Sequence, residues 1–401
     1  LAAVMMEVNH PILDTEIKWC GCLSKQRGAN HLGGTHTAVL PAEDEAMPTE
    51  PVMTRTVRAF SFLGWRWALV GVVLWLGVGC TSVSNPKISP ETPVAEHHTS
   101  PTQSKTWDVR HIALTFDDAP RGQGPVYSGA ERGQALVKAL AEADSGPVAF
   151  FVTTRGFEQP GGRERIARYA AAGHLVGNHT HTHPWLSKSE VDTYVADIEQ
   201  ATRHLQGLAN VRPWFRFPYL DEGRPLDKRK AIQKALQTRG LRNGYVTIDN
   251  YDWYLERRWH EAVQQGRTAN HEALGQLYVE VLMSAVRFYD DIARCDLGRS
   301  PAHVLLLHEN DLAALFIGRL IVALRAEGWA LVSPDAAYAD PIAFQTPQTL
   351  ITNQGRVAAL AVDAGRNPRT LTHLAIEEEQ LDALMESRGV FGPIPEPSGQ
   401  R

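Results

Sequence analysis

The sequence predicts an α/β fold in which parallel strands form a distorted (β/α)7-type barrel. From about Arg110 onward, short apolar runs alternate with longer amphipathic segments. Strands that alternate with helices indicate a parallel sheet with helical crossovers. About seven such units are present, which favours an open or distorted barrel over a complete eight-fold one. The expected strands are residues 111–116, 148–153, 174–177, 214–217, 243–248, 303–307 and 330–332.

One helix is well marked by its periodicity. Apolar residues recur in alternating steps of four and three, which places them on one face of a helix; they are Leu274, Tyr278, Val281, Ala285, Phe288 and Ile292. A second helix is expected over residues 372–388, because Gly389 follows it as a C-terminal stop signal.

Composition sets limits on the class of protein. A chain of 401 residues allows one large domain with appendages. A hydrophobic content of 43% and a charged content of 21% are ordinary for a globular protein. The net charge of −5 is mild and no basic stripe is present, so we expect no nucleic-acid partner. Four cysteines are too few for a disulfide scaffold.

The N-terminal part has the features of an export signal. Residues 1–52 lack periodicity, and we expect them to be a non-native or disordered extension that precedes a true start at Met53. Residues 53–80 combine a basic beginning, an apolar run over 67–79 and a closing Cys80, which is typical of a signal peptide. The run is shorter than the roughly 20 apolar residues of a transmembrane helix.

Cys80 is a candidate for lipidation. The residues before it resemble a bacterial lipoprotein signal, although Gly77 stands where Leu is usual. A plain signal peptide with an incidental cysteine, or an uncleaved anchor, is the alternative. We expect an exported protein of the cell envelope or periplasm, anchored to the membrane through Cys80. Residues 81–109 read as a Ser/Thr/Pro-rich linker, 110–340 as the catalytic domain and 341–401 as a C-terminal extension.

Two adjacent acids follow the first expected strand. Asp117 and Asp118 are costly to place beside an apolar strand unless each has a partner. One can bind a cation while the other acts as a base, but a pair of capping acids in a loop is the simpler interpretation of these two residues alone. Active sites of parallel α/β folds lie at the carboxyl ends of the strands, which favours the chemical interpretation.

The third expected strand is followed by three histidines within five residues. His179 and His183 are four apart, so on a helical turn both imidazoles would lie on one face and could hold one metal ion. A histidine-rich surface turn is the alternative. Zn²⁺ accepts neutral imidazole, and a carboxylate such as Asp118 can complete a three-ligand site with one position left open.

Three further clusters follow later strands. Arg216 precedes Pro218 and Tyr219, where a forked guanidinium contact could orient a carboxylate. Asp252 and Trp253 follow the fifth strand, and His308 stands at the tip of the sixth, a suitable place for a general acid. Taken alone, each has an ordinary structural interpretation as a surface Arg, a turn acid or a structural His.

The order of the five clusters is more specific than any one of them. Asp-Asp, His-x-x-x-His, Arg-x-Pro-Tyr, Asp-Trp and Leu-x-His follow successive strands. This succession resembles the NodB-homology polysaccharide deacetylases, also called carbohydrate esterase family 4. The resemblance covers about residues 110–335 and implies the distorted barrel of that family.

The resemblance implies a metal site and an acid–base pair. Asp118, His179 and His183 would be the ligands of a divalent metal, with Zn²⁺ as the expected ion. Asp117 would be the general base, oriented by Arg216. His308 would be the general acid, and a nearby Asp252 would raise its pKa and favour the protonated form.

The resemblance also implies a substrate pocket. The backbone N–H of Tyr219 would help to stabilise the oxyanion, and Trp253 and Leu306 would line the acetyl pocket. Two positions depart from the family pattern. Ala119 stands where Gly is usual, which we expect to be tolerated because the following Pro120 favours an extended conformation there. The residue after His308 is Glu309 rather than the commoner Asp.

The predicted function is metal-dependent removal of N-acetyl groups from a glycan that contains N-acetylglucosamine. Three alternatives stay open: an O-acetyl esterase acting on a xylan-like polymer, an amide hydrolase acting on a small molecule, and a lipoprotein that binds glycan without turnover. The presence of Asp117 and His308 argues against the last, because a decayed enzyme tends to lose such residues.

Overall fold

The computed structural model describes residues 109–350 and 353–395. The expected N-terminal extension, the signal peptide with Cys80 and all but the last residue of the linker lie outside this part of the chain. Within the part described, no helix has both the length and the apolar character needed to cross a membrane.

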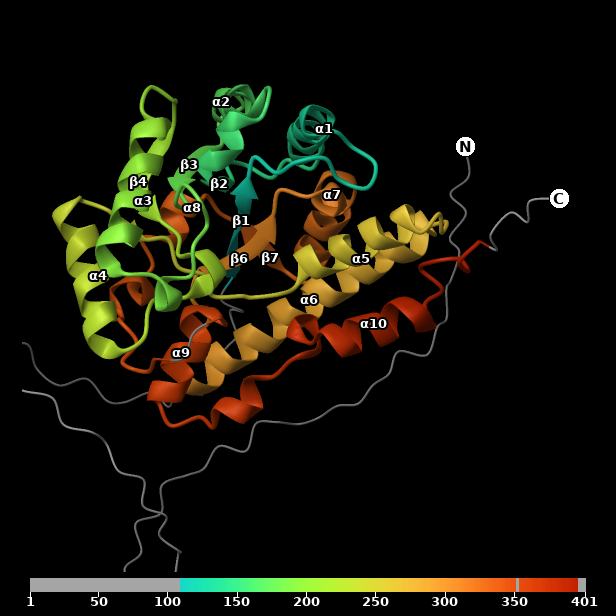
Figure 1. Ribbon diagram of the computed structural model, residues 1–401. Coiled ribbons are helices and arrows are strands. Elements are labelled where there is room, and N and C mark those ends of the chain that lie inside the picture. The colour runs from blue at the N-terminus through green and yellow to red at the C-terminus, as the bar shows by residue number, and fades with distance from the viewer. Residues whose placement is uncertain (1–108, 351–352, 396–401) are drawn as a thin grey trace, which may run out of the picture. The chain divides into compact units, whose positions relative to one another are not determined.

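The centre of the fold is a sheet in which all strand pairs are parallel (Figure 1). Its order is β5-β4-β3-β2-β1-β6, and β7 pairs with the beginning of β1. The strands are β1 Arg110–Ala119, β2 Ala149–Val152, β3 Leu175–Asn178, β4 Val211–Phe215, β5 Arg242–Asn243, β6 His303–His308 and β7 Trp329–Leu331. All seven expected strands are therefore present, with shifted ends.

The segment after β5 closes the barrel. β5 pairs with β4 through only two residues, and five residues later Ile248 forms a parallel bridge with Leu305 of β6. The N–H groups of Thr247 and Ile248 both donate to the carbonyl of Val304, at 3.0 and 3.2 Å. The expected strand at 243–248 is thus divided between two neighbours. This division confirms the distorted barrel predicted from the sequence.

Helices surround the sheet in chain order. They are α1 Gly129–Glu142, α2 Gly162–Ala171, α3 Val191–Leu205, α4 Leu226–Thr238, α5 Asp252–Gln264, α6 His271–Asp296, α7 Asp311–Ala326, α8 Pro334–Ala337, α9 Gly355–Asp363 and α10 Glu378–Ser387. The periodic face predicted from Leu274 to Ile292 belongs to α6, whose apolar stripe is buried.

Residues 341–395 pack on the same core as the barrel. α9 and α10 both contact the long helix α6, and α10 runs alongside it in Figure 1. Val357 and Leu381 are fully buried in the main hydrophobic cluster. The helix expected over 372–388 begins later, at Glu378, because the preceding residues form a short 3₁₀ turn, Leu374–Ile376.

Candidate functional site

The carboxyl ends of β1, β3 and β6 border a cleft of about 500 Å³. Parallel strands bring their carboxyl ends to one edge, so side chains far apart in sequence meet there. Most of the residues expected to act line this cleft: Asp117, Asp118, His179, His183, Tyr219, Trp253, Leu306 and His308. Arg216 and Asp252 lie behind it, each bonded to a residue that lines it.

Asp118, His179 and His183 form a group that can hold a metal ion. Their candidate ligand atoms all lie within 4.8 Å of one another. The Asp118 Oδ1 atom is 3.2 Å from Nε2 of His183 and 3.6 Å from Nε2 of His179. Two ligands about 2.0–2.1 Å from one ion at a tetrahedral angle are roughly 3.3 Å apart, so these separations fit a single small cation.

The protonation of His179 suits metal binding. Its Nδ1 lies 2.8 Å from the carbonyl oxygen of Arg216. A carbonyl only accepts, so Nδ1 carries the proton and Nε2 presents its lone pair to Asp118, a pattern that commonly orients metal-binding histidines. Burial lowers the pKa of His179 to about 4, which keeps the ring neutral near pH 7.

The two histidines converge through a loop and not through a helical turn as the sequence predicted. His179 directly follows β3, and His183 has a positive φ of 60°. The hydroxyl of Thr180, itself at φ 70°, accepts a hydrogen bond from the His183 N–H at 3.0 Å. This tight turn brings the two rings to a centroid separation of 5.0 Å. His181 points away and contacts the Thr154 hydroxyl.

A similar backbone feature separates the two adjacent acids. Asp118 has a φ of 65°, which turns its side chain away from that of Asp117. Ala119 itself does not have a positive φ, so the departure from Gly at this position brings no strain of that kind. Asp117 is 3% exposed and lies below the cleft surface, whereas 29% of the Asp118 side chain is exposed.

Asp117 is fixed by a buried guanidinium. The Nη1 atom of Arg216, which directly follows β4, donates to Oδ1 of Asp117 at 2.8 Å. The Nη2 atom of the same group donates to the hydroxyls of Thr115 and Tyr338 at 3.2 and 3.0 Å. These bonds fix the orientation of the Asp117 carboxylate.

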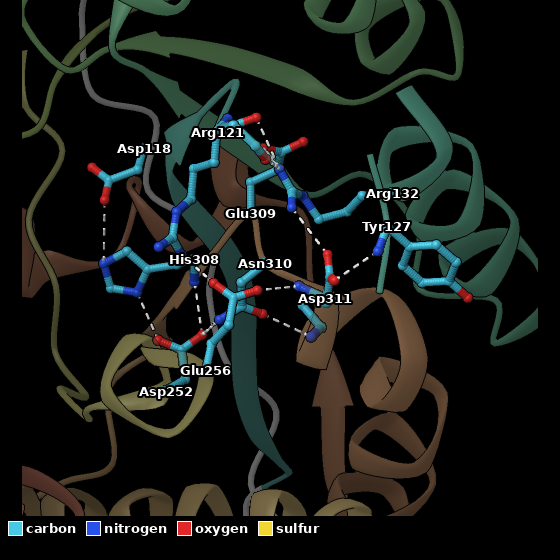
Figure 2. A network of polar contacts seen from close by, with 12 residues as sticks. Asp118, Arg121, Tyr127, Arg132, Asp252, Glu256, His308, Glu309, Asn310 and Asp311 are labelled. Carbon is cyan, nitrogen blue, oxygen red and sulfur yellow. Dashed lines mark hydrogen bonds and ion pairs between the residues drawn. The ribbon is translucent and has the colours of Figure 1, made fainter. Parts of the chain in front are cut away.

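His308 faces the metal-ligand group across the cleft. Its Nδ1 contacts Oδ1 of Asp252 at 2.6 Å, and its Nε2 lies 4.0 Å from Oδ2 of Asp118 (Figure 2). Burial alone would lower the pKa of His308, but the charge and hydrogen bond of Asp252, together with the charge of Asp118, raise it to about 9. The protonated imidazolium is therefore the dominant form near pH 7.

The remaining expected residues form the walls of the cleft. Tyr219 is 41% exposed, has a φ of 58° and stacks on Trp185 with ring centroids 4.0 Å apart. Leu306 is 5% exposed and Trp253 is half-buried. The sequence did not single out Trp185, which has no motif spacing of its own. The stacked pair makes a flat aromatic surface beside His183.

Asp249 also lines the cleft, although the sequence analysis did not single it out. It is 4% exposed and belongs to the cleft. Burial raises the pKa of Asp249 to about 8, so the carboxyl is mainly protonated at neutral pH. The only feature of the sequence that could have indicated a role for Asp249 is its place shortly before Tyr251 and Asp252.

A buried charge network behind His308 was also missed. Glu309 and Asp311, both fully buried, contact Arg132 of α1, and Glu309 also contacts Arg165 of α2 at 3.1 Å. Figure 2 shows Glu309, Asp311 and Arg132 beside Arg121, whose backbone N–H donates to Glu309. The sequence showed Glu309 only as a departure from a pattern, because its arginine partners lie more than 140 residues away.

Comparison with known proteins identifies the domain. Residues 104–241 match the family described as polysaccharide deacetylase. The chain is 37% identical over 146 residues to a chitooligosaccharide deacetylase of Rhizobium leguminosarum bv. trifolii, covering 36% of this chain and 60% of that protein. It is 33% identical over 115 residues to a chitin deacetylase of Colletotrichum lindemuthianum, covering 27% of this chain and 42% of that protein.

The chain therefore spans less than two thirds of the length of either relative. Among solved structures, a family 4 carbohydrate esterase from Streptomyces lividans in complex with acetate aligns with a TM-score of 0.37 at 20% identity, over 57% of this chain and 95% of that chain. The family match and the curated relatives agree with the resemblance found in the motifs. Over residues 104–241 the chain thus matches the polysaccharide deacetylase family, the NodB-homology family that is also called carbohydrate esterase family 4.

Proposed function

We propose that this protein is a metal-dependent deacetylase that hydrolyses the N-acetyl groups of a glycan containing N-acetylglucosamine. One observation carries the proposal. Three metal-ligand side chains and a buried Asp–Arg pair lie on one side of a cleft, and an Asp–His pair faces them. This is the arrangement that a hydrolysis with one base and one acid requires.

In this proposal each residue has a defined task. Asp118, His179 and His183 hold a divalent cation, proposed to be Zn²⁺, which when bound polarises the acetyl carbonyl and makes a water molecule more acidic. Asp117 takes the proton of the attacking water, and the hydrogen bond from Arg216 orients its carboxylate for this task. His308 then delivers a proton to the nitrogen of the leaving amine.

Two groups would stabilise and orient the reacting acetyl unit. The backbone N–H of Tyr219 would donate to the developing oxyanion. Asp252 accepts from both the Nδ1 and the backbone N–H of His308, at 2.6 and 2.9 Å, and so fixes the ring that donates the proton. Trp253 and Leu306 would hold the acetyl methyl group.

The substrate class rests on the relatives and on the cleft walls. Both relatives carry names that refer to chitin or its oligosaccharides. The Trp185–Tyr219 stack and Trp253 offer flat apolar faces to sugar rings. N-acetyl groups are proposed over O-acetyl groups because the curated relatives are named for N-acetylated glycans.

We further propose that the protein is exported and anchored to the membrane by a lipid on Cys80. The support is the basic start, apolar run and terminal cysteine of residues 53–80. A glycan of the cell envelope would then be within reach of the domain.

The proposal is tested by acetate release from N-acetylated chitin oligomers, with acetylxylan as the comparison, after reconstitution with Zn²⁺. Asp117→Asn should reduce turnover by about 10² to 10⁴-fold, the usual contribution of a general base, while the metal content stays unchanged. His179→Ala should lose the metal in elemental analysis. An Asp117→Asn variant as active as the parent refutes the assigned base, and acetate from acetylxylan alone refutes the N-acetyl substrate.

A further inference from the structure

A second, smaller cavity lies beside Arg216, and Leu220 lines both this cavity and the cleft. It has a volume of about 20 Å³, and Arg216 and Leu220 form part of its wall. Two other arginines line it, Arg229 of α4 and Arg356 of α9, and they are only 3% and 6% exposed. Buried charges normally have a partner of opposite sign, so this pair needs an explanation.

Within residues 109–350 and 353–395, no carboxylate forms an ion pair with either of these two guanidinium groups. Nη1 of Arg229 donates to the carbonyl of Thr349 at 2.5 Å, and Nη1 of Arg356 donates to the carbonyl of Ala343 at 3.0 Å. The Nε atoms of both are buried without a hydrogen-bond partner. Among the residues that the structure describes, neither side chain forms an ion pair within 4.0 Å, although buried polar atoms are nearly always bonded.

The charges around the cavity do not balance. Arg216 is already paired with Asp117. Of the other charged groups that line the cavity, Arg229 and Arg356 are positive and Glu222 is negative, which leaves one excess positive charge. Glu222 is held by a 2.7 Å hydrogen bond from the Nδ2 of Asn243. Burial lowers the pKa of Arg356, and the negative charge of Glu222 only partly opposes that effect.

The backbone brings Arg356 to this cavity by a close approach at Gly355. Gly355 has a φ of 79°, and a Cβ there would lie 2.7 Å from the carbonyl oxygen of Val246. Because that space is free, the N–H of Arg356 donates to the same carbonyl at 2.7 Å. The Arg356 guanidinium then packs over the ring of Tyr245, 4.0 Å from its centroid. The arginine is therefore held inside by its backbone as well as its side chain.

We propose that this cavity binds one small monovalent anion, and that chloride is its ligand. One negative charge makes the enclosed group neutral, and the orphaned Nε–H groups of Arg229 and Arg356 are donors for it. A volume of this order admits one body about the size of a water molecule. Acetate, phosphate and sulfate are too large for it. The site is separate from the proposed metal centre, so its test does not depend on turnover.

Direct evidence would come from crystals of the protein soaked in bromide, which replaces chloride and scatters anomalously. A single strong anomalous peak between Arg229 and Arg356 is expected. In solution, replacing gluconate by chloride at constant ionic strength and pH should raise the Tm by about 2 to 4 °C, the shift that a ligand at a few times its Kd gives a domain of this size.

Variants separate a specific site from a general salt effect. Arg356→Gln and Arg229→Gln should each lose the chloride-dependent rise in Tm, because either change removes the excess positive charge. Arg242→Gln is the matched control, since Arg242 is exposed in β5 next to Asn243 and should respond as the parent does. Bromide-soaked crystals without a peak in the cavity, or a parent Tm that is equal in chloride and gluconate, would overturn the proposal and leave only a buried water.

Discussion

At His308, burial and charge act on the pKa in opposite directions, and charge has the larger total effect. Burial disfavours the imidazolium, whereas Asp252 at 2.6 Å and Asp118 at 4.0 Å favour it. For Asp249, in the same cleft, burial outweighs the hydrogen bond from the Asn250 N–H and the charge of His308, so its pKa rises to about 8. The two groups show how neighbouring titratable residues acquire different proton states from their surroundings.

The raised pKa of His308 predicts the alkaline limit of activity. A general acid must be protonated, so turnover should be full below the pKa of His308 and should fall as the pH rises through it. That value is about 9 without a cation, and a cation bound at Asp118 would repel the imidazolium and lower it. Asp252→Asn removes the main favourable charge and should move the alkaline limb of the kcat profile down by about 1 to 3 pH units.

The control for this experiment is Asp335→Asn, which removes an exposed carboxylate that pairs with Arg212 and does not line the cleft. Its alkaline limb should stay near that of the parent. An Asp252→Asn profile that keeps its shape and position, with only a uniform loss of rate, would show that Asp252 does not set the proton state of His308.

Which residues converge could be predicted from the sequence, but the way in which they converge could not. Strand order alone brings the tips of β1, β3 and β6 together, so the motif residues were expected to meet. The meeting of Asp118 and His183 also needs positive φ angles at both. Neither residue is Gly, so no sequence signal for that conformation was present.

At the scale of elements, two loops that flank the cleft are tied together by buried charges. The loop between β1 and α1 donates backbone N–H groups to two acids that follow β6. Arg121 donates to Glu309 in the loop at 2.6 Å, and Val126 and Tyr127 donate to Asp311, the first residue of α7, at 2.9 and 3.0 Å. Arg121 also pairs with Glu256 of α5 at 3.0 Å. The wall of the cleft that carries Arg121 is thereby held in place (Figure 2).

Glu309→Gln tests this tie between loops. Gln keeps the size of the side chain but removes the charge opposite Arg165, while Arg132 retains Asp311. Removing one partner of a buried ion pair leaves an uncompensated charge, so the free energy of unfolding should fall by about 3 to 5 kcal/mol. Urea unfolding followed by circular dichroism measures the change.

The matched control is Glu142→Gln, which breaks an exposed pair with Lys138 on α1 at 3.8 Å. Such pairs contribute about 0.5 kcal/mol or less. Equal losses in the two variants would mean that Glu309 does not act as a buried partner. The sequence could not predict this tie, because long-range pairs between a loop acid and helix arginines leave no periodic pattern.

At the scale of the whole described domain, the barrel and the residues after it share one hydrophobic core. The sequence predicted the barrel well, because apolar strands alternate with amphipathic helices as far as β7. Beyond Pro341 that alternation ends, and the helices are short: α9 has nine residues and α10 has ten. Short helices are specified mainly by tertiary packing, which a single sequence does not display.

The shared core leads to a prediction about α10. Leu381 is fully buried in the main hydrophobic cluster, so Leu381→Ala should lower the free energy of unfolding by about 2 to 5 kcal/mol through lost burial and a residual cavity. Leu226→Ala, at a position that is 44% exposed in α4, is the control and should cost about 0.5 kcal/mol or less. A single cooperative transition in both proteins is expected if α10 and the barrel unfold together. A Leu381→Ala variant with the stability of the control, or a separate early transition in the parent, would show that the C-terminal helices fold apart from the barrel.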